Sequence, residues 1–161
     1  MESSKASQKD DEKRDEKMKI KLIRNGVVID HITSGKALQV LEILGIGEDY
    51  SDEVTIGMNI HSKSMGKKDI AKLENRDVKT DEINKIAIIA PKATINRIVE
   101  YKVVKKDKVV LPNEIIGILK CQNPQCISNK AREPVKSRFY VTQREPLVLT
   151  CKYCEREGKG V

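Results

Sequence analysis

The sequence predicts an α+β protein with two parts, a β-α-β-β-α-β domain followed by a small β-rich domain built around four cysteines. Alternating, β-branched segments are interleaved with two amphipathic segments over residues 18–109. All four cysteines follow residue 120, in two close pairs. With 161 residues, of which 39% are hydrophobic, the chain is long enough for one or two small domains with modest cores.

Turn and capping signals mark the first strands and the first helix. Residues 19–24 alternate between polar and apolar side chains, Asn25-Gly26 is a strong turn signal, and residues 27–32 are again strand-like. Ser34 is a candidate cap for a helix over residues 35–44, in which apolar residues recur at helical spacing. We therefore expect a helix to follow the first strands directly.

The next segments repeat the strand and helix pattern. Residues 54–60 and 69–75 are strand-like, and a polar loop separates them. Thr80 starts the second predicted helix, because the acidic residues that follow it lie near the positive end of the helix dipole. Pro91 ends this helix.

The last strand of the first domain is predicted over residues 93–104, and residues 105–112 form the predicted linker. The complete order is β-α-β-β-α-β. This is the split βαβ, or ferredoxin-like, arrangement of one antiparallel sheet with two helices on one face. The second domain is predicted over residues 113–161, where residues 138–149 supply hairpin strands between the two cysteine pairs.

The two cysteine pairs have the spacing of a four-thiolate metal site. Cys121 and Cys126 form C-x4-C, and Cys151 and Cys154 form C-x2-C after an insert of 24 residues. Each pair forms a knuckle, and the insert brings the two knuckles together, which predicts one structural zinc ion per chain. Two disulfides, a redox dithiol and an iron–sulfur site are the alternatives. A site closed by four sulfurs leaves no coordination position for a substrate.

Composition and charge argue against a secreted protein and against a membrane protein. Residues 1–17 are hydrophilic and of mixed charge, so we expect a disordered tail and no signal peptide. No apolar run reaches the length that spans a membrane, which predicts a soluble protein without a membrane partner in the reducing cytoplasm. The net charge of +7 is diffuse and fits anionic ligands, acidic partners or nucleic acid.

The first domain has few residues suited to catalysis or to RNA stacking. Tyr101 is the only aromatic residue on its predicted strands, whereas RNA recognition modules stack bases on several aromatic side chains. Asp30-His31 is the only suggestive acid–base pair, and simple strand alternation points the two side chains to opposite faces. Binding of an anionic small molecule has better support, because basic residues gather on the predicted strands and turns. These residues are Lys68, Lys72, Arg97, Lys102, Lys105 and Lys106.

Several stretches, in one order around the four cysteines, resemble a known family. They are VIDHI at residues 28–32, TIGMNI at 55–60, MGKKDIAKLEN at 65–75, APKATINRI at 90–98 and CKYCE at 151–155. On these residues the chain resembles the regulatory chain of aspartate carbamoyltransferase, from about Lys17 to Glu155. The resemblance implies a non-catalytic subunit of an enzyme of pyrimidine biosynthesis. Its first domain would bind CTP, ATP or related nucleotides and pair with a second regulatory chain, and its zinc domain would dock on the catalytic chain.

The resemblance also implies the positions that contact the nucleotide. They are Ile23, Asp30, His31, Lys72, Asn96, Ile98, Tyr101, Val103 and Lys106. In this interpretation Lys72 and Lys106 meet phosphates, Asp30 meets the ribose, and the backbone around Ile23 and Tyr101 reads the base. The principal alternative is a free-standing zinc protein that senses nucleotides or binds nucleic acid, and a dithiol enzyme is a remote third. The missing aromatic platform argues against nucleic acid.

Overall fold

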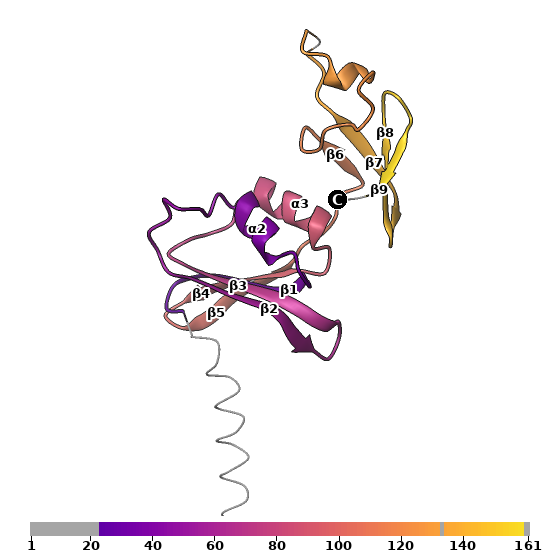
Figure 1. Cartoon of the computed structure of the whole chain (residues 1–161). Helices are drawn as coiled ribbons and strands as arrows, with labels where there is room; N and C mark the ends of the chain where they lie inside the picture. Colours follow the sequence, from indigo (N-terminus) through magenta and orange to yellow (C-terminus); the bar gives the residue numbers. More distant parts are fainter. Residues whose placement is uncertain (1–22, 133, 160–161) are drawn as a thin grey trace, which may run out of the picture.

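The computed structural model describes residues 23–132 and 134–159, which form two antiparallel sheets (Figure 1). The larger sheet has the strand order β2-β3-β1-β4-β5. Its strands are β1 (Gly26–Thr33), β2 (Val54–Ser62), β3 (Gly66–Glu74), β4 (Thr94–Val99) and β5 (Lys102–Lys108). Helices α2 (Ala37–Ile43) and α3 (Thr80–Ile89) cover one face of this sheet. The predicted ferredoxin-like order is confirmed, and β5 extends it by one strand.

Strand alternation sorts the larger sheet into a core face and an open face. Val27, Ile29, Leu73 and Ile95 are fully buried and pack in one apolar core with residues of α2 and α3. The residues between them in sequence point to the other side of the sheet. We call that side the open face, because the helices do not cover it (Figure 1).

A buried carboxylate, rather than the predicted cap, fixes the start of α2. Asp69 is fully buried, and its Oδ2 accepts the backbone N–H groups of Gly35 and Ala37 at 2.9 and 3.0 Å. The hydroxyl of Ser34 instead donates to the side chain of Asn59. The prediction that Ser34 caps the helix was therefore wrong, and α2 is shorter than predicted.

Helix α3 begins and ends as the sequence predicts. Its first residue is Thr80, and the carboxylate of Glu82 accepts the backbone N–H of Lys79, the cap residue, at 3.1 Å. Arg76 reaches the other carboxylate oxygen of Glu82 at 2.7 Å. The helix stops at Ile89, two residues before Pro91, because proline cannot continue the hydrogen-bond pattern.

The predicted last strand over residues 93–104 is in fact a hairpin. Glu100 and Tyr101 have positive φ angles of 46° and 63°, and the chain reverses there from β4 into β5. Such two-residue turns usually contain glycine or asparagine, and neither marks this one in the sequence. The Asn25 side chain accepts the N–H of Glu100 and the Arg24 carbonyl accepts that of Tyr101, so residues distant in sequence hold the turn.

Two further sequence predictions change at the ends of the first sheet. Strand β5 runs to Lys108, so half of the segment predicted as a linker belongs to the sheet. Of the strand predicted over residues 19–24, residues 19–22 lie outside the described residues, and so does the predicted tail over residues 1–17. Ile23 and Arg24 are not in a strand.

The smaller sheet has the strand order β6-β7-β8-β9. Its strands are β6 (Glu114–Ile116), β7 (Arg138–Arg144), β8 (Leu147–Cys151) and β9 (Glu157–Lys159), and a short 3-10 helix, η1 (Ile127–Asn129), lies in the insert. The hairpin predicted over residues 138–149 is confirmed as β7 and β8, whereas β9 was not predicted. Ile115, Phe139 and Leu149 are buried next to the cysteines. None of the described helices is long and apolar enough to cross a membrane.

Candidate functional site

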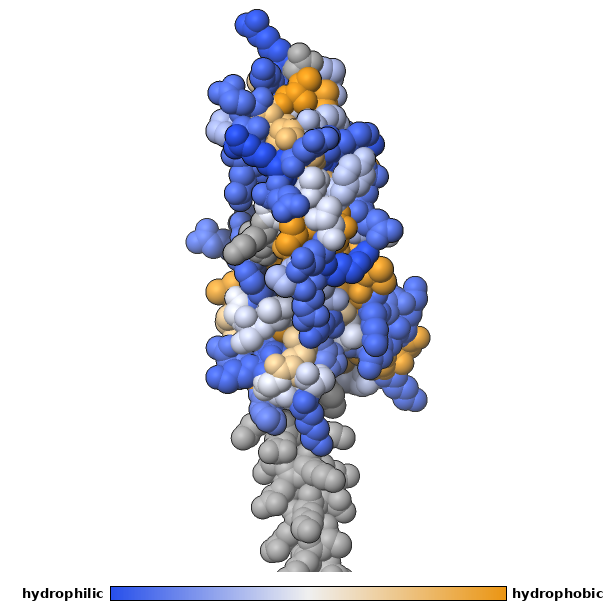
Figure 2. All heavy atoms as spheres, turned by 90° about the vertical axis from the view of Figure 1, so that its right-hand side faces the viewer, coloured by the Kyte–Doolittle hydropathy of each residue, from blue (hydrophilic) through white to orange (hydrophobic). Residues whose placement is uncertain are grey.

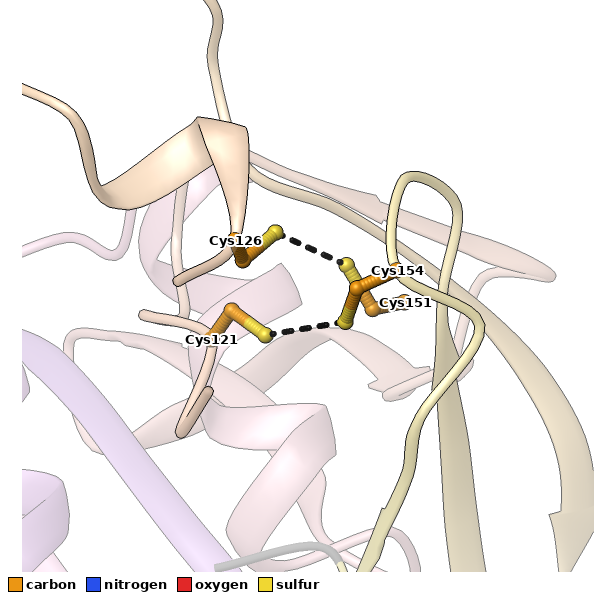
Figure 3. A group of neighbouring side chains, drawn as sticks. All are labelled: Cys121, Cys126, Cys151 and Cys154. Atoms are coloured by element: carbon orange, nitrogen blue, oxygen red, sulfur yellow. Dashed lines mark hydrogen bonds between the residues drawn. The ribbon is translucent and has the colours of Figure 1, made fainter. Parts of the chain in front are cut away.

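The structure brings the sulfurs of all four cysteines together (Figure 3). Cys121 Sγ lies 3.6 Å from Cys154 Sγ, and Cys126 Sγ lies 3.7 Å from Cys151 Sγ. All four sulfurs lie within 4.8 Å of one another, and no disulfide joins them. A metal–sulfur bond of about 2.3 Å places the corners of a tetrahedron about 3.8 Å apart, so these spacings suit one metal ion at the centre.

Hydrogen bonds from the backbone prepare the same sulfurs for negative charge. Each sulfur accepts the N–H of the residue two positions further along the chain. The donors are Asn123 for Cys121, Ser128 for Cys126, both Cys154 and Tyr153 for Cys151, and Arg156 for Cys154. Hydrogen bonds to a charged acceptor are the stronger ones, so this pattern favours thiolates over thiols.

The electrostatic environments of the four thiols differ before any metal binds. Burial raises the pKa of Cys121 to about 12, and the neighbouring thiols add to the rise. The N–H of Arg156 lowers the pKa of Cys154 to about 6. A bound cation would stabilise all four as thiolates, because metal coordination deprotonates thiols. The donor set therefore fits a thiophilic divalent metal, and four sulfurs fill a tetrahedral shell without leaving a position for a substrate.

On the larger sheet, residues from four strands form one row across the open face. Val28 pairs with Lys72 on one side and with Asn96 on the other, and Asn96 pairs with Lys106. Directly opposed residues of antiparallel strands project to the same face. Two cations and one amide, all predicted to contact a nucleotide, therefore share the open face.

The other strand residues of the predicted set follow the same register. Ile98 on β4 pairs with Val103 on β5, and Asp30 on β1 pairs with Thr94 on β4. By alternation these residues also project to the open face. Backbone contacts then bring the non-strand residues close, since the Arg24 carbonyl accepts the N–H of Tyr101 at 2.9 Å, next to Ile23.

A β-bulge removes the alternation argument against a shared Asp30–His31 site. The pairing of β1 with β3 shifts between Ile29 and Ile32, and His31 has a φ of 54°. An extra residue in one strand re-aims the side chains around it. As a result His31 Nδ1 lies 3.2 Å from Thr94 Oγ1 and 3.9 Å from Asp30 Oδ2.

Lys68 and Thr94 belong to this cluster, although neither is among the positions predicted to contact the nucleotide. Lys68 Nζ lies 2.9 Å from Asp30 Oδ1, and both side chains are about four-fifths buried, with exposures of 19% and 21%. The sequence predicts Lys68 only as one of several basic residues that favour an anionic ligand. The bulge, which sequence alternation does not reveal, is what brings them together.

Lys72 differs from the other cations of the open face because it is buried. Only 8% of its surface is exposed. Burial lowers the pKa of the Lys72 ammonium, and the negative charge of Asp30 partly opposes this change. A buried cation on a surface rich in polar groups is a candidate partner for an anionic ligand.

The fold and the metal centre define a two-part α+β protein in which a ferredoxin-like domain precedes a structural metal domain. Comparison with known protein families gives the particular family. Residues 18–110 match the family described as the aspartate carbamoyltransferase regulatory chain, allosteric domain, and residues 113–160 match that of the same chain's metal binding domain. The chain belongs to the family of aspartate carbamoyltransferase regulatory chains.

Individual relatives agree with this assignment. The chain is 51% identical over 146 residues to the aspartate carbamoyltransferase regulatory chain of Methanothermobacter thermautotrophicus, covering 91% of this chain and 92% of the relative. It is 50% identical over 143 residues to that of Thermococcus gammatolerans, covering 89% and 93%. The protein is therefore a non-catalytic, regulatory subunit with an allosteric and a metal-binding domain, and a catalytic chain is its implied partner.

Proposed function

We propose that this regulatory chain senses CTP- or ATP-type nucleotides on the open face of its larger sheet and transmits their binding to a catalytic chain. The observation that supports this most is the strand register, in which residues from β1, β3, β4 and β5 converge on one face. The nucleotide-binding residues of the proposal are Ile23, Asp30, His31, Lys72, Asn96, Ile98, Tyr101, Val103 and Lys106.

Each part of a nucleotide has a chemically suitable partner in this set. Lys72 and Lys106 are flexible cations for phosphate oxygens, and Asp30 is an acceptor for ribose hydroxyls. Asp30 is already paired with Lys68 at 2.9 Å, so this carboxylate is held in place before a ligand arrives. The backbone near Ile23 and Tyr101 supplies donors and acceptors for the base edge, because the hydrogen bond between Arg24 and Tyr101 aligns the two segments.

The four cysteines hold one zinc ion in this proposal. Cys121, Cys126, Cys151 and Cys154 would be its ligands, and zinc suits four thiolates in a tetrahedron. The role of the ion is structural. It joins the loop after β6, which contains Cys121 and Cys126, to the turn between β8 and β9. In this way it fixes the protein surface around the metal site.

The metal-binding domain, over residues 113–161, is the proposed docking surface for the catalytic chain. Ile116, Ile127 and Tyr140 each expose more than 40% of their surface in this part of the chain. Figure 2 displays one side of the molecule, where hydrophilic side chains dominate and apolar groups reach the surface as separate patches. Apolar and aromatic residues inside a polar rim are typical of protein interfaces.

A second copy of the chain is the proposed partner of the allosteric domain, over residues 18–109. Strand β2 is an edge of the larger sheet, and Ile56 and Met58 on it are 37% and 39% exposed. An exposed apolar edge strand is suited to pairing with another strand. The assembled complex would act in pyrimidine biosynthesis in the cytoplasm, without nucleic acid.

The test is reconstitution. The purified chain alone should have no carbamoyl transfer activity, since its zinc shell is filled by sulfur. It should co-purify with the catalytic chain, and CTP and ATP should change the aspartate saturation curve of the complex. A ligand shifts a two-state equilibrium only if it binds the two states with different affinities. Curves that are identical with and without each nucleotide would contradict the proposal, as would turnover by this chain alone.

A further inference from the structure

One asparagine side chain closes the first metal-binding knuckle. Asn129 is the last residue of η1, three positions after Cys126. Its side-chain Nδ2 donates to the backbone carbonyls of Cys121 and Asn123, each at 2.7 Å. Both hydrogens of the amide are thus used within the C-x4-C loop.

These two bonds determine how the peptide groups of the loop are oriented. The carbonyl of Asn123 also accepts the N–H of Cys126 at 3.0 Å, and the Asn129 N–H donates to the Cys126 carbonyl at 2.9 Å. Asn129 thereby holds the two peptide groups on either side of the Gln122–Asn123 peptide group, whose N–H, that of Asn123, donates to the Cys121 sulfur. The side chain of Asn129 therefore acts on the sulfur through the backbone.

The second knuckle is held in a different way. Cys151 is the last residue of β8, and its N–H donates to the Arg156 carbonyl at 3.0 Å, where the chain turns toward β9. The Glu155 N–H donates to the Cys151 carbonyl at 3.0 Å. A sheet hairpin thus supports Cys151, whereas the first knuckle lies between β6 and η1, outside the strands.

We propose that Asn129 is a positioning residue for the metal centre, which keeps the sulfurs of Cys121 and Cys126 in the geometry that binds metal. The inference rests on the proposed binding of metal by the four cysteines. A preorganised loop loses less conformational entropy when the metal binds and reopens less often when it is bound. Removing the two hydrogen bonds that the Asn129 side chain donates should therefore speed the release of the metal.

The decisive variant is Asn129→Asp, which keeps the size of the side chain and removes both of its donors. Gln125→Ala is the matched control, because Gln125 is exposed in the same loop and bonds there through its backbone. Zinc release from each full-length protein to an excess of chelator is followed with a chromophoric indicator. We expect release from Asn129→Asp to be faster by roughly 10- to 100-fold, the size of the affinity loss typical when a group that orients a metal ligand is changed, and release from Gln125→Ala to be unchanged.

Amide hydrogen exchange separates positioning from a general loss of stability. In Asn129→Asp, the amides of Asn123 and Cys126 should exchange faster, while those of β7 and β8 keep their protection. Asn129→Ser, which retains one donor, should give an intermediate release rate. Equal release from Asn129→Asp and the wild type, or equally increased exchange throughout the smaller sheet, would overturn the inference. A wild-type protein that binds no zinc would instead contradict the proposed metal site.

Discussion

The two sheets of this chain are stabilised by different means. The larger sheet buries a set of fully enclosed aliphatic side chains between its core face and two helices. The smaller sheet contributes Ile115, Phe139 and Leu149, and its remaining buried residues are largely cysteines. A domain of about 50 residues has room for only a small apolar core, so we expect a metal bound by the four cysteines to supply much of its stability.

This difference corresponds to the two proposed tasks of the chain, which are nucleotide sensing on the larger sheet and docking through the metal-binding domain. A packed core tolerates a polar open face, because the face contributes little to the core. A domain organised around one metal ion is instead expected to be stable or unstable as a unit, which suits the docking surface proposed for it. Val109 and Leu111 lie in one apolar cluster with buried residues of both sheets. The two sheets are therefore in contact, and the predictions below test whether each can unfold without the other.

The largest expected effect comes from losing the metal. Structural zinc contributes on the order of 10–16 kcal/mol of apparent binding free energy, all of which is folding free energy if the site is absent from the unfolded domain. Cys151→Ser, or chelation, should therefore unfold the smaller sheet and abolish association with the catalytic chain, while the larger sheet stays folded. Circular dichroism and amide exchange show which sheet unfolds, and co-elution with the catalytic chain shows whether the two chains still associate. Normal assembly by Cys151→Ser would contradict this expectation.

A substitution in the apolar core should have the converse effect. Ile29 is fully buried, and Ile29→Ala should destabilise the larger sheet by about 2–5 kcal/mol, through lost transfer energy and the cavity left behind. Val104→Ala on β5, where the side chain is 60% exposed, is the control and should change little. Denaturant unfolding and metal content are measured together. If Ile29→Ala also loses its metal, the two sheets do not fold independently.

Substitutions on the open face should change nucleotide affinity without unfolding either sheet. Lys106→Ala should weaken CTP binding more than cytidine binding, by about 1.5–3 kcal/mol for a charge-assisted hydrogen bond to phosphate. Asp30→Ala should weaken both ligands, because it would remove a partner of the ribose. Calorimetry on the isolated regulatory chain measures these affinities. Equal losses for CTP and cytidine in Lys106→Ala would show that Lys106 does not meet the phosphates.

Much of this architecture could be predicted from local sequence patterns. The spacing of the cysteines indicates their convergence, because two short-spaced pairs leave few other geometries. The second helix was also predictable, since its acidic first turn and the following proline act within a few residues. These features share one property, which is that the interactions that determine them are close in sequence.

The features that sequence reasoning missed depend on distant partners. The turn at Glu100-Tyr101 is supported by Arg24 and Asn25, some 75 residues earlier. The start of α2 depends on Asp69, which lies on β3. The bulge that lets the side chains of Asp30 and His31 share one site arises from the pairing between β1 and β3. Local propensity contains no information about any of these partners, so tertiary contacts decided them.

The smallest expected effect, and the most specific to the open face, concerns the charge of Lys72. Burial lowers the pKa of this ammonium in the folded chain, so folding disfavours the charged form. Lys72→Met removes that cost, and we expect a small gain in folding stability at neutral pH. The same variant should bind CTP less tightly, which would make Lys72 a position where function opposes stability.

The sign of the pH dependence distinguishes this explanation from a change in packing. Because the pKa of Lys72 is lower in the folded than in the unfolded chain, the unfolded chain binds more protons between the lowered value and the ordinary lysine value of 10.5. Stability contributed by this group therefore rises with pH across that window. The advantage of Lys72→Met over the wild type should shrink as the pH rises toward 10.5, and paired thermal melts at several alkaline pH values measure it. A constant advantage at every pH would mean that the methionine acts by packing, and that burial of the Lys72 charge carries no cost for folding.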